Sequence, residues 1–143
     1  MNKLFITSVL LCSANLASAS LVKLECPVTV EAEYSTGTVE KNAEIMVLEI
    51  ETINGITFFS GSGRSLIDMS SKKSKSIVQV IDSSDSGKWE LMVDTLQSHM
   101  SLRIDRNSGA LFYQETFNSP RGGQIVTTVT GNCRKIDTSK RMF

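Results

Sequence analysis

The sequence contains little histidine or cysteine, which restricts its chemistry. His99 is the only histidine among 143 residues, and there are three cysteines. A structural zinc site takes about four Cys, His or carboxylate ligands, and a nucleophilic triad needs a histidine beside the nucleophile. No G-x-S-x-G nucleophile elbow is present either. We therefore expect no catalytic residue, no metal and no cofactor, and a hydrolytic enzyme is the least favoured class of function.

An excess of charge and a second long apolar run are also missing. Fifteen Lys and Arg residues balance fifteen Asp and Glu residues, whereas nucleic-acid-binding domains carry a basic excess. After the first residues, no apolar run approaches the roughly 18 residues of a membrane helix. We expect no nucleic-acid partner and no membrane span.

The first 19 residues predict a signal peptide. Lys3 supplies the positive start, residues 4–12 are apolar, and a small-residue cleavage site ends at Ala19. The apolar run is too short to cross a bilayer. Cleavage after Ala19 leaves residues 20–143 as a single β domain of 124 residues, in which 14 basic residues face 15 acidic ones because only Lys3 is lost. The protein is expected to be periplasmic or secreted.

The three cysteines raise the alternative of a lipid anchor and predict a disulfide in the fold. A lipoprotein anchored through Cys12 is the alternative, but Leu11 stands where the lipoprotein peptidase normally requires a small residue. Cleavage after residue 19 removes Cys12 and leaves Cys26 and Cys133. In an oxidising compartment these two predict one disulfide, with a pair of buried free thiols as the alternative.

Short runs rich in Val, Ile, Thr and aromatic residues alternate with Ser, Gly and Asn, which is typical of strands and turns. In residues 28–34 the apolar positions alternate with Thr29, Glu31 and Glu33, as in a half-buried strand. Residues 44–53 alternate in the same way and end at Asn54-Gly55, which is a type I′ hairpin signal. Later strands are predicted over residues 77–81, around Trp89, Leu91 and Val93, and over residues 100–105, 111–117 and 124–133.

About eight sequential strands predict an all-β fold, an antiparallel meander closed as a small barrel to hide its edges. A β-sandwich is the alternative. The only helix expected is one or two turns within residues 94–98. Residues 66–69 form a short apolar patch, and residues 70–75, which include Lys72 and Lys75, predict a solvated loop.

Three patterns look like sites and are interpreted as ordinary β structure. Residues 82–87 begin like an EF-hand loop, but the twelfth position is Val93 rather than a bidentate glutamate, so a hairpin turn is predicted. Gly61 to Arg64 looks like a phosphate cradle, but no Lys-Ser/Thr pair or helix follows. Trp89 lies on the apolar phase of its strand and is expected to anchor the core, with a ligand-stacking platform as the alternative.

Acidic and basic residues are unevenly distributed along the chain. Residues 22–53 contain seven glutamates against Lys23 and Lys41, whereas seven basic residues face three acidic ones from Arg103 onward. Our interpretation is that acidic and basic strands are neighbours in the sheet, where opposed charges stabilise by roughly a few tenths of a kcal/mol per pair. A basic docking face for an acidic partner is the alternative.

Residues 102–109, with the pattern I-D-R-x-S-G, and residues 131–135, with the pattern G-x-C-x-K, resemble the endings of many small exported bacterial β-proteins. The resemblance implies an exported β fold and no particular activity. More loosely, the chain is similar to periplasmic lysozyme inhibitors, in which residues 60–63 would correspond to an inhibitory loop. Their Cys-x-x-Gly opening is missing here, so no residue role is transferred.

These observations favour an exported, non-catalytic binding or interaction protein of the bacterial envelope. We expect a monomer whose partner is a protein or a small ligand. The alternatives are an enzyme inhibitor and a barrel that binds a small apolar ligand. A deep cavity lined by Phe58, Trp89 and Phe112 would favour the ligand-binding barrel, whereas a filled core with protruding loops would favour a protein partner.

Overall fold

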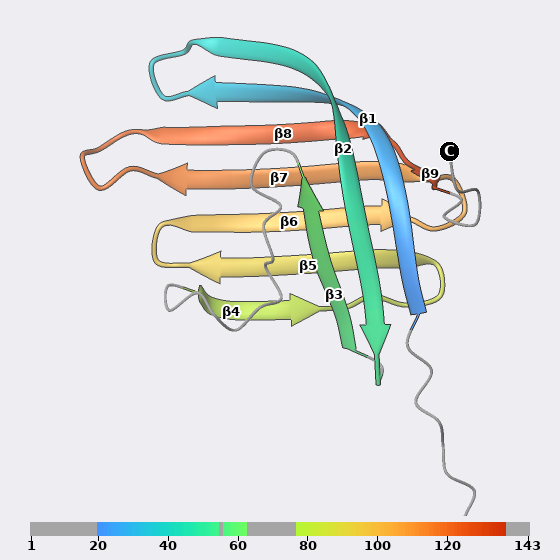
Figure 1. Cartoon of the computed structure of the whole chain (residues 1–143). Coiled ribbons are helices and arrows are strands. Elements are labelled where there is room, and N and C mark those ends of the chain that lie inside the picture. Colours follow the sequence, from blue (N-terminus) through green and yellow to red (C-terminus); the bar gives the residue numbers. More distant parts are fainter. Residues whose placement is uncertain (1–19, 55, 63–76, 137–143) are drawn as a thin grey trace, which may run out of the picture.

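The computed structural model describes residues 20–54, 56–62 and 77–136. These residues form an all-β antiparallel meander that curls into a nearly closed barrel, with no helix among them (Figure 1). The predicted signal peptide, the apolar patch at 66–69 and the loop at 70–75 lie outside the described residues. The strands are β1 (Ser20–Tyr34), β2 (Val39–Ile53), β3 (Ile56–Ser62), β4 (Ile77–Asp82), β5 (Lys88–Thr95), β6 (Ser98–Asp105), β7 (Ala110–Asn118), β8 (Gln124–Asn132) and β9 (Arg134–Lys135).

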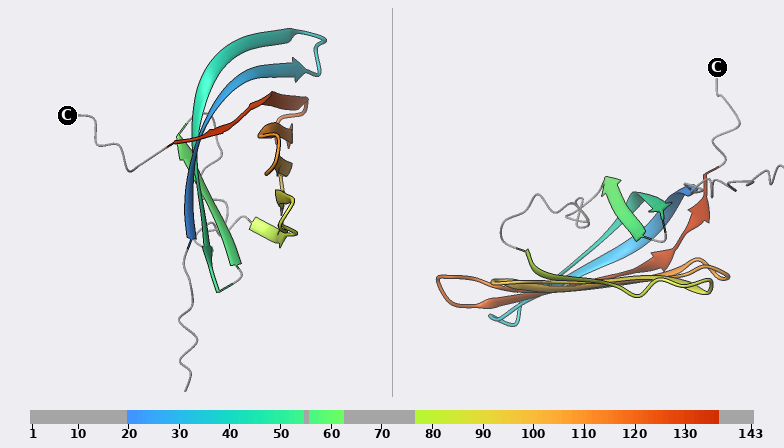
Figure 2. Two further views of the ribbon diagram at one scale, coloured as in Figure 1. Left: turned by 90° about the vertical axis from the view of Figure 1, so that its right-hand side faces the viewer. Right: turned by 90° about the horizontal axis from the view of Figure 1, so that it is seen from below.

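The long bent strands β1 and β2 turn one sheet into two layers. Each has 15 residues, and they pair with each other over almost their whole length. Only the second part of β1, from Val28 to Tyr34, also pairs with β8. The first part of β1 turns away and crosses, with β2 and β3, in front of the sheet made by β4 to β8 (Figures 1 and 2). The barrel interior is the space between these two layers.

The pairing of β1 with β8 joins the beginning of the meander to its last long strand. The strand order is β3-β2-β1-β8-β7-β6-β5-β4, so β1 and β8 are neighbours and β3 and β4 lie at the two ends of the described sheet. The backbone N–H of Thr57 in β3 donates to Oδ2 of Asp82 in β4 over 3.0 Å. This hydrogen bond links the two end strands, and we call the line between them the seam.

Replacing Asp82 is expected to loosen the seam without unfolding the barrel. In Asp82→Ala the Thr57 amide loses its acceptor, and a hydrogen bond to a charged group contributes about 1.5–3 kcal/mol. We expect hydrogen exchange at this amide to become about tenfold faster or more, while core amides in β6 and β7 stay protected. Asp82→Asn keeps an acceptor oxygen and serves as the control. Unchanged exchange at Thr57 in the alanine variant would contradict this role for Asp82.

The core follows the two-residue alternation that the sequence predicts. Val28, Val30 and Ala32 are buried, whereas Glu31 and Glu33 between them are exposed. Trp89 is only 6% exposed, which confirms that it anchors the core. The buried hydrophobic side chains come from both layers: Leu24, Cys26, Val28, Val30, Met46, Leu48, Ile50, Phe59, Trp89, Leu91, Val93, Leu102, Ile104, Leu111, Tyr113 and Val129.

The prediction of a helix within residues 94–98 is wrong. Asp94 pairs with His99 across the β5–β6 hairpin, and the Thr95 hydroxyl accepts hydrogen bonds from the backbone N–H groups of Gln97 at 3.2 Å and Ser98 at 2.8 Å. Because the two strands already pair on either side, only a tight turn fits between them. Leu96 lies at its tip and is 87% exposed.

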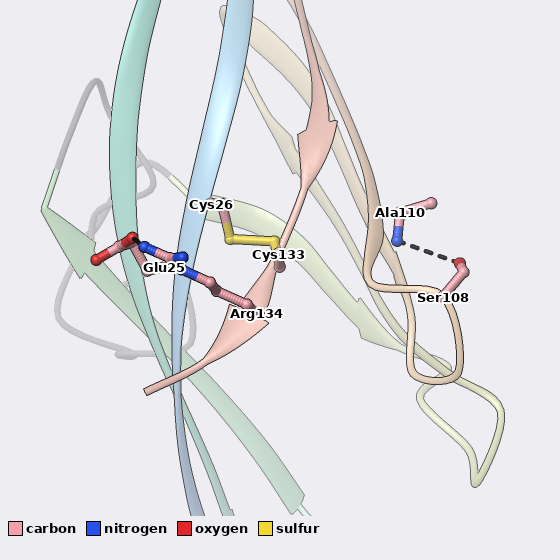
Figure 3. Close-up of a disulfide and its surroundings, with 6 residues drawn as sticks. All are labelled: Glu25, Cys26, Ser108, Ala110, Cys133 and Arg134. Carbon is pink, nitrogen blue, oxygen red and sulfur yellow. Dashed lines mark hydrogen bonds and ion pairs between the residues drawn. A yellow bond between two sulfur atoms is a disulfide. The ribbon is translucent and has the colours of Figure 1, made fainter. Parts of the chain in front are cut away.

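The expected disulfide joins Cys26 to Cys133 at the point where β1 changes partners (Figure 3). Before Cys26, residues Leu24 and Glu25 pair with β9, and after it Val28 begins the pairing with β8. Cys26 is fully buried. The bond therefore fixes the bend of β1 against the end of the last long strand.

Candidate functional site

A cavity of about 250 Å³ lies at the end of the barrel where β1 begins and β2 ends. We call it the mouth pocket. Both layers contribute to its walls, together with the turn between β4 and β5 and the turn between β6 and β7. Its lining residues are Ser20, Val22, Ile50, Thr52, Thr57, Ser84, Asp85, Trp89 and Arg106.

The strand register separates the pocket into a hydroxyl rim and an apolar floor. Ser20 pairs with Thr52, and Thr52 pairs with Thr57, so three hydroxyl residues stand in one row across β1, β2 and β3. Two residues deeper, Val22 pairs with Ile50, which is 1% exposed. Side chains two residues apart share one face of a strand, so the polar row and the apolar row follow directly from the sequence of each strand.

The turn between β4 and β5 is held by its own carboxylates. Asp85 Oδ1 accepts hydrogen bonds from the backbone N–H groups of Gly87 at 2.7 Å and Lys88 at 2.9 Å, and Asp82 Oδ1 accepts one from the N–H of Ser84 at 2.9 Å. The hydrogen bond from the Gly87 N–H, and after it the one from the Lys88 N–H, hold the pKa of Asp85 below its usual value. Both carboxylates thus accept the backbone hydrogen bonds that hold the turn together. The prediction of a hairpin turn in place of an EF-hand loop is confirmed.

Arg106 projects from the turn after β6 onto the face of Trp89. Its guanidinium carbon lies 4.7 Å from the centre of the indole ring, a cation–π distance. Nη1 donates to the backbone carbonyl oxygen of Asp85 over 2.9 Å, and the backbone N–H of Arg106 donates to the carbonyl of Gly87 over 3.0 Å. The turns before β5 and after β6 therefore hold the guanidinium in place. Within the described ranges, no carboxylate forms an ion pair with it.

Sequence reasoning missed Arg106 as a site residue. It opens the turn formed by residues 106–109, where a charged residue is ordinary. The structure confirms Trp89 as a core anchor, and its buried ring also lines the mouth pocket. The one sequence signal that pointed to a site here was that Trp89 closely follows the turn from Asp82 to Gly87.

Among the described residues, Phe58, Trp89 and Phe112 do not line a common cavity, the feature that would have favoured a ligand-binding barrel. Phe112 is 43% exposed and lies between Leu111 and Tyr113, which are both buried. Phe58 lies between buried Thr57 and buried Phe59 and is itself only half-buried. Successive side chains of a strand point to opposite faces, so Phe58 and Phe112 belong to the outer face while Trp89 faces inward.

The other candidate residues are not part of the mouth pocket. His99 is exposed and contacts Asp94 on the neighbouring strand. Ser60, Gly61 and Ser62, compared above with an inhibitory loop and a phosphate cradle, belong to β3 and pair with residues 47–49 of β2; Gly63 and Arg64 lie outside the described residues. The part of the chain that the structure describes holds no group of three or more His, Cys, Asp or Glu residues that could bind a metal.

Only one described ion pair joins the acidic first part of the chain to the basic last part. Arg134 in β9 binds Glu25 in β1, next to the disulfide (Figure 3). Glu31 and Glu49 instead pair with Lys41 and Lys23, within the β1–β2 hairpin itself. Among the described residues, two of the three ion pairs that these glutamates make therefore lie inside the acidic hairpin, and one reaches the basic last part of the chain.

The sequence matches no protein-family model and no curated protein. Among the described residues, no helix is long and apolar enough to cross a membrane.

Proposed function

We propose that this chain is an exported, non-catalytic binding protein of the bacterial envelope that holds a small ligand in the mouth pocket. The observation that carries the proposal is the pocket itself, in which a row of hydroxyl groups stands over an apolar floor between two layers. Ligand sites combine apolar walls with a few polar groups that orient the ligand. A volume of about 250 Å³ suits a small molecule or the end of a longer one.

Export is supported by the amino-terminal sequence and by the disulfide. Residues 1–19 have the composition of a signal peptide, and a Cys26–Cys133 bond suits an oxidising compartment. Protein recovered from the periplasm is expected to begin at Ser20, as amino-terminal sequencing would show. A mature chain that keeps residues 4–12, or that carries lipid on Cys12, would contradict export by this route.

A non-catalytic role is supported by how the polar groups are used. Asp85, the carboxylate of the mouth pocket, accepts two backbone hydrogen bonds. The Ser84 hydroxyl is also occupied, since it accepts a hydrogen bond from the backbone N–H of Glu90 over 3.0 Å. His99 belongs to the far end of β6. The polar groups of the mouth pocket are therefore suited to orient and bind a ligand.

Filling the mouth pocket tests the proposal. Benzamide and benzoate are small probes with an apolar ring and a polar head, and we expect them to shift the NMR signals of Trp89 and Ser84. Val22→Phe places a larger side chain into the floor and is expected to reduce binding of both probes about tenfold or more, because the space for the ring is lost. The readout is the dissociation constant from chemical-shift titration.

Val39→Phe is the matched control. Val39 is 54% exposed at the start of β2, so the same substitution there adds bulk outside the mouth pocket. We expect this variant to bind both probes as the unmodified protein does. Equal binding by the Val22→Phe and Val39→Phe variants would exclude the mouth pocket as the ligand site.

A further inference from the structure

The guanidinium of Arg106 is oriented, and among the described residues only part of its donor capacity is used. An arginine side chain offers five N–H donors, and one nitrogen, Nη1, donates to the Asp85 carbonyl. The guanidinium carbon also lies over the Trp89 ring. A planar guanidinium held in this way presents its remaining donors as a fixed fork, the arrangement that matches the two oxygens of a carboxylate.

Asp85 and Arg106 form no ion pair, although the nearby charge of Arg106 contributes to the lowered pKa of the Asp85 carboxyl. Asp85 lines the same cavity, but its carboxylate accepts from the Gly87 and Lys88 amides, while Arg106 bonds to its backbone carbonyl instead. No ion pair within 4.0 Å joins Arg106 to Asp85 or to another described carboxylate. The lining therefore holds the Arg106 guanidinium, the ionised carboxylate of Asp85 and, in a chain that begins at Ser20, the α-ammonium group of that residue. Two positive charges and one negative charge leave one net positive charge, which favours a ligand with one negative charge.

The remaining lining suits the rest of such a ligand. The hydroxyl groups of Ser20, Thr52 and Thr57 can donate to carboxylate oxygens, and Val22 and Ile50 offer aliphatic surface below them. A phosphate carries more charge and usually draws more than one basic side chain, whereas Arg106 is the only Lys or Arg among the described residues that line the mouth pocket.

We propose that the ligand of the mouth pocket is a carboxylic acid, whose carboxylate binds Arg106 and whose apolar part rests on Val22 and Ile50. This inference rests on the proposed function, because it names the class of ligand for the same pocket. A free small organic acid and the carboxyl end of an aliphatic chain present the same chemical group, so both belong to this class.

Calorimetric titration of the full exported protein with matched acids and amides tests the inference. The probes are benzoate against benzamide and octanoate against octanamide, which differ in charge but hardly in shape. We expect each acid to bind about 10- to 100-fold more tightly than its amide, the range that corresponds to hydrogen bonds made by charged groups. Tighter binding of benzoate than octanoate would identify a small acid, and the reverse would identify a chain end.

Substitution of Arg106 tests whether this residue causes the preference for acids over amides. In Arg106→Gln we expect the acids to lose their advantage over the amides, and in Arg106→Lys to keep part of it, since lysine retains the charge without the fork. Arg103→Gln is the matched control. Arg103 is exposed, three residues earlier on β6, and contacts Glu90 rather than the mouth pocket, so the same loss of charge there should leave the preference intact.

Several results would overturn the inference. Equal binding of acid and amide by the unmodified protein, or an acid preference that survives in Arg106→Gln, would do so. Tighter binding of phenyl phosphate than of benzoate would assign the pocket to phosphates instead. If Val22→Phe abolishes binding of the amides while no acid preference exists, the inference fails and the proposed function stands. If no probe binds the unmodified protein, both fail. Should Arg106→Gln not fold, Arg106→Lys alone decides, because an unreduced acid preference there would contradict the fork.

Discussion

Removal of the Cys26–Cys133 disulfide is expected to lower the free energy of unfolding by about 4–5 kcal/mol. The bond closes a loop with a sequence separation of 107 residues, and the chain-entropy model gives about 4.7 kcal/mol for a loop of about 100 residues. A small domain has a total stability of roughly 5–15 kcal/mol. The Cys26→Ala, Cys133→Ala variant should therefore unfold at a much lower urea concentration, measured by the fluorescence of Trp89.

Fully reduced, unmodified protein is the control for this variant. It keeps both sulfur atoms, so a difference between it and the double-alanine variant reports the cavity beside buried Cys26 rather than the cross-link. We also expect a steeper dependence of the unfolding free energy on urea without the bond, because the unfolded chain becomes more expanded. Free thiols in the exported protein, or equal urea midpoints for the oxidised and reduced forms, would contradict a stabilising bond.

Gly109→Ala is expected to be among the most damaging single substitutions in the barrel. Gly109 has φ +77°, and a Cβ atom there would lie 2.2 Å from the backbone oxygen of Cys133. The left-handed conformation costs a non-glycine residue about 1–2 kcal/mol, and moving the packed backbone costs about 1–3 kcal/mol more. Chemical unfolding followed by circular dichroism should show a loss of about 2–5 kcal/mol, the sum of these two effects.

Two other glycines separate the two effects. Gly122 has φ +85°, but no atom lies within 4 Å of the position that an added Cβ would take, so Gly122→Ala should show the conformational cost alone, about 1–2 kcal/mol. At Gly131 a positive φ is not involved, but the added Cβ would lie 2.3 Å from the Pro27 oxygen, so Gly131→Ala should show the cost of close approach. Equal destabilisation by Gly109→Ala and Gly122→Ala would mean that the contact with Cys133 relaxes freely.

The strand positions and their buried faces could be predicted because both depend on neighbours in the sequence. Val28 and Val30 alternate with exposed residues, and Trp89 and Leu91 share the inner face of β5, as the two-residue period requires. The same alternation argues against a cavity shared by Phe58, Trp89 and Phe112. Phe58 and Phe112 each lie between two inward-facing residues, and this alternation places them on the outer face.

The mouth pocket could not be predicted, because its residues come from strands and turns far apart in the chain. Ser20 pairs with Thr52, and Arg106, which follows the end of β6, reaches Trp89 at the start of the neighbouring strand β5. None of these contacts is encoded in a local pattern. They depend on the register between strands and on the place where β1 leaves β8, which the Cys26–Cys133 bond fixes.

By itself the sequence determined the all-β class, the strands that alternate, the turn held by Asp85 and the two cysteines available for a bond, since each is written in residue types and short spacings. Only the tertiary structure decided where the barrel has its seam. It also decided that Arg106 stands over Trp89 at the pocket mouth. The physical reason is that side-chain alternation is a property of one strand, whereas closure and convergence depend on how bent strands cross and on which distant backbones pair.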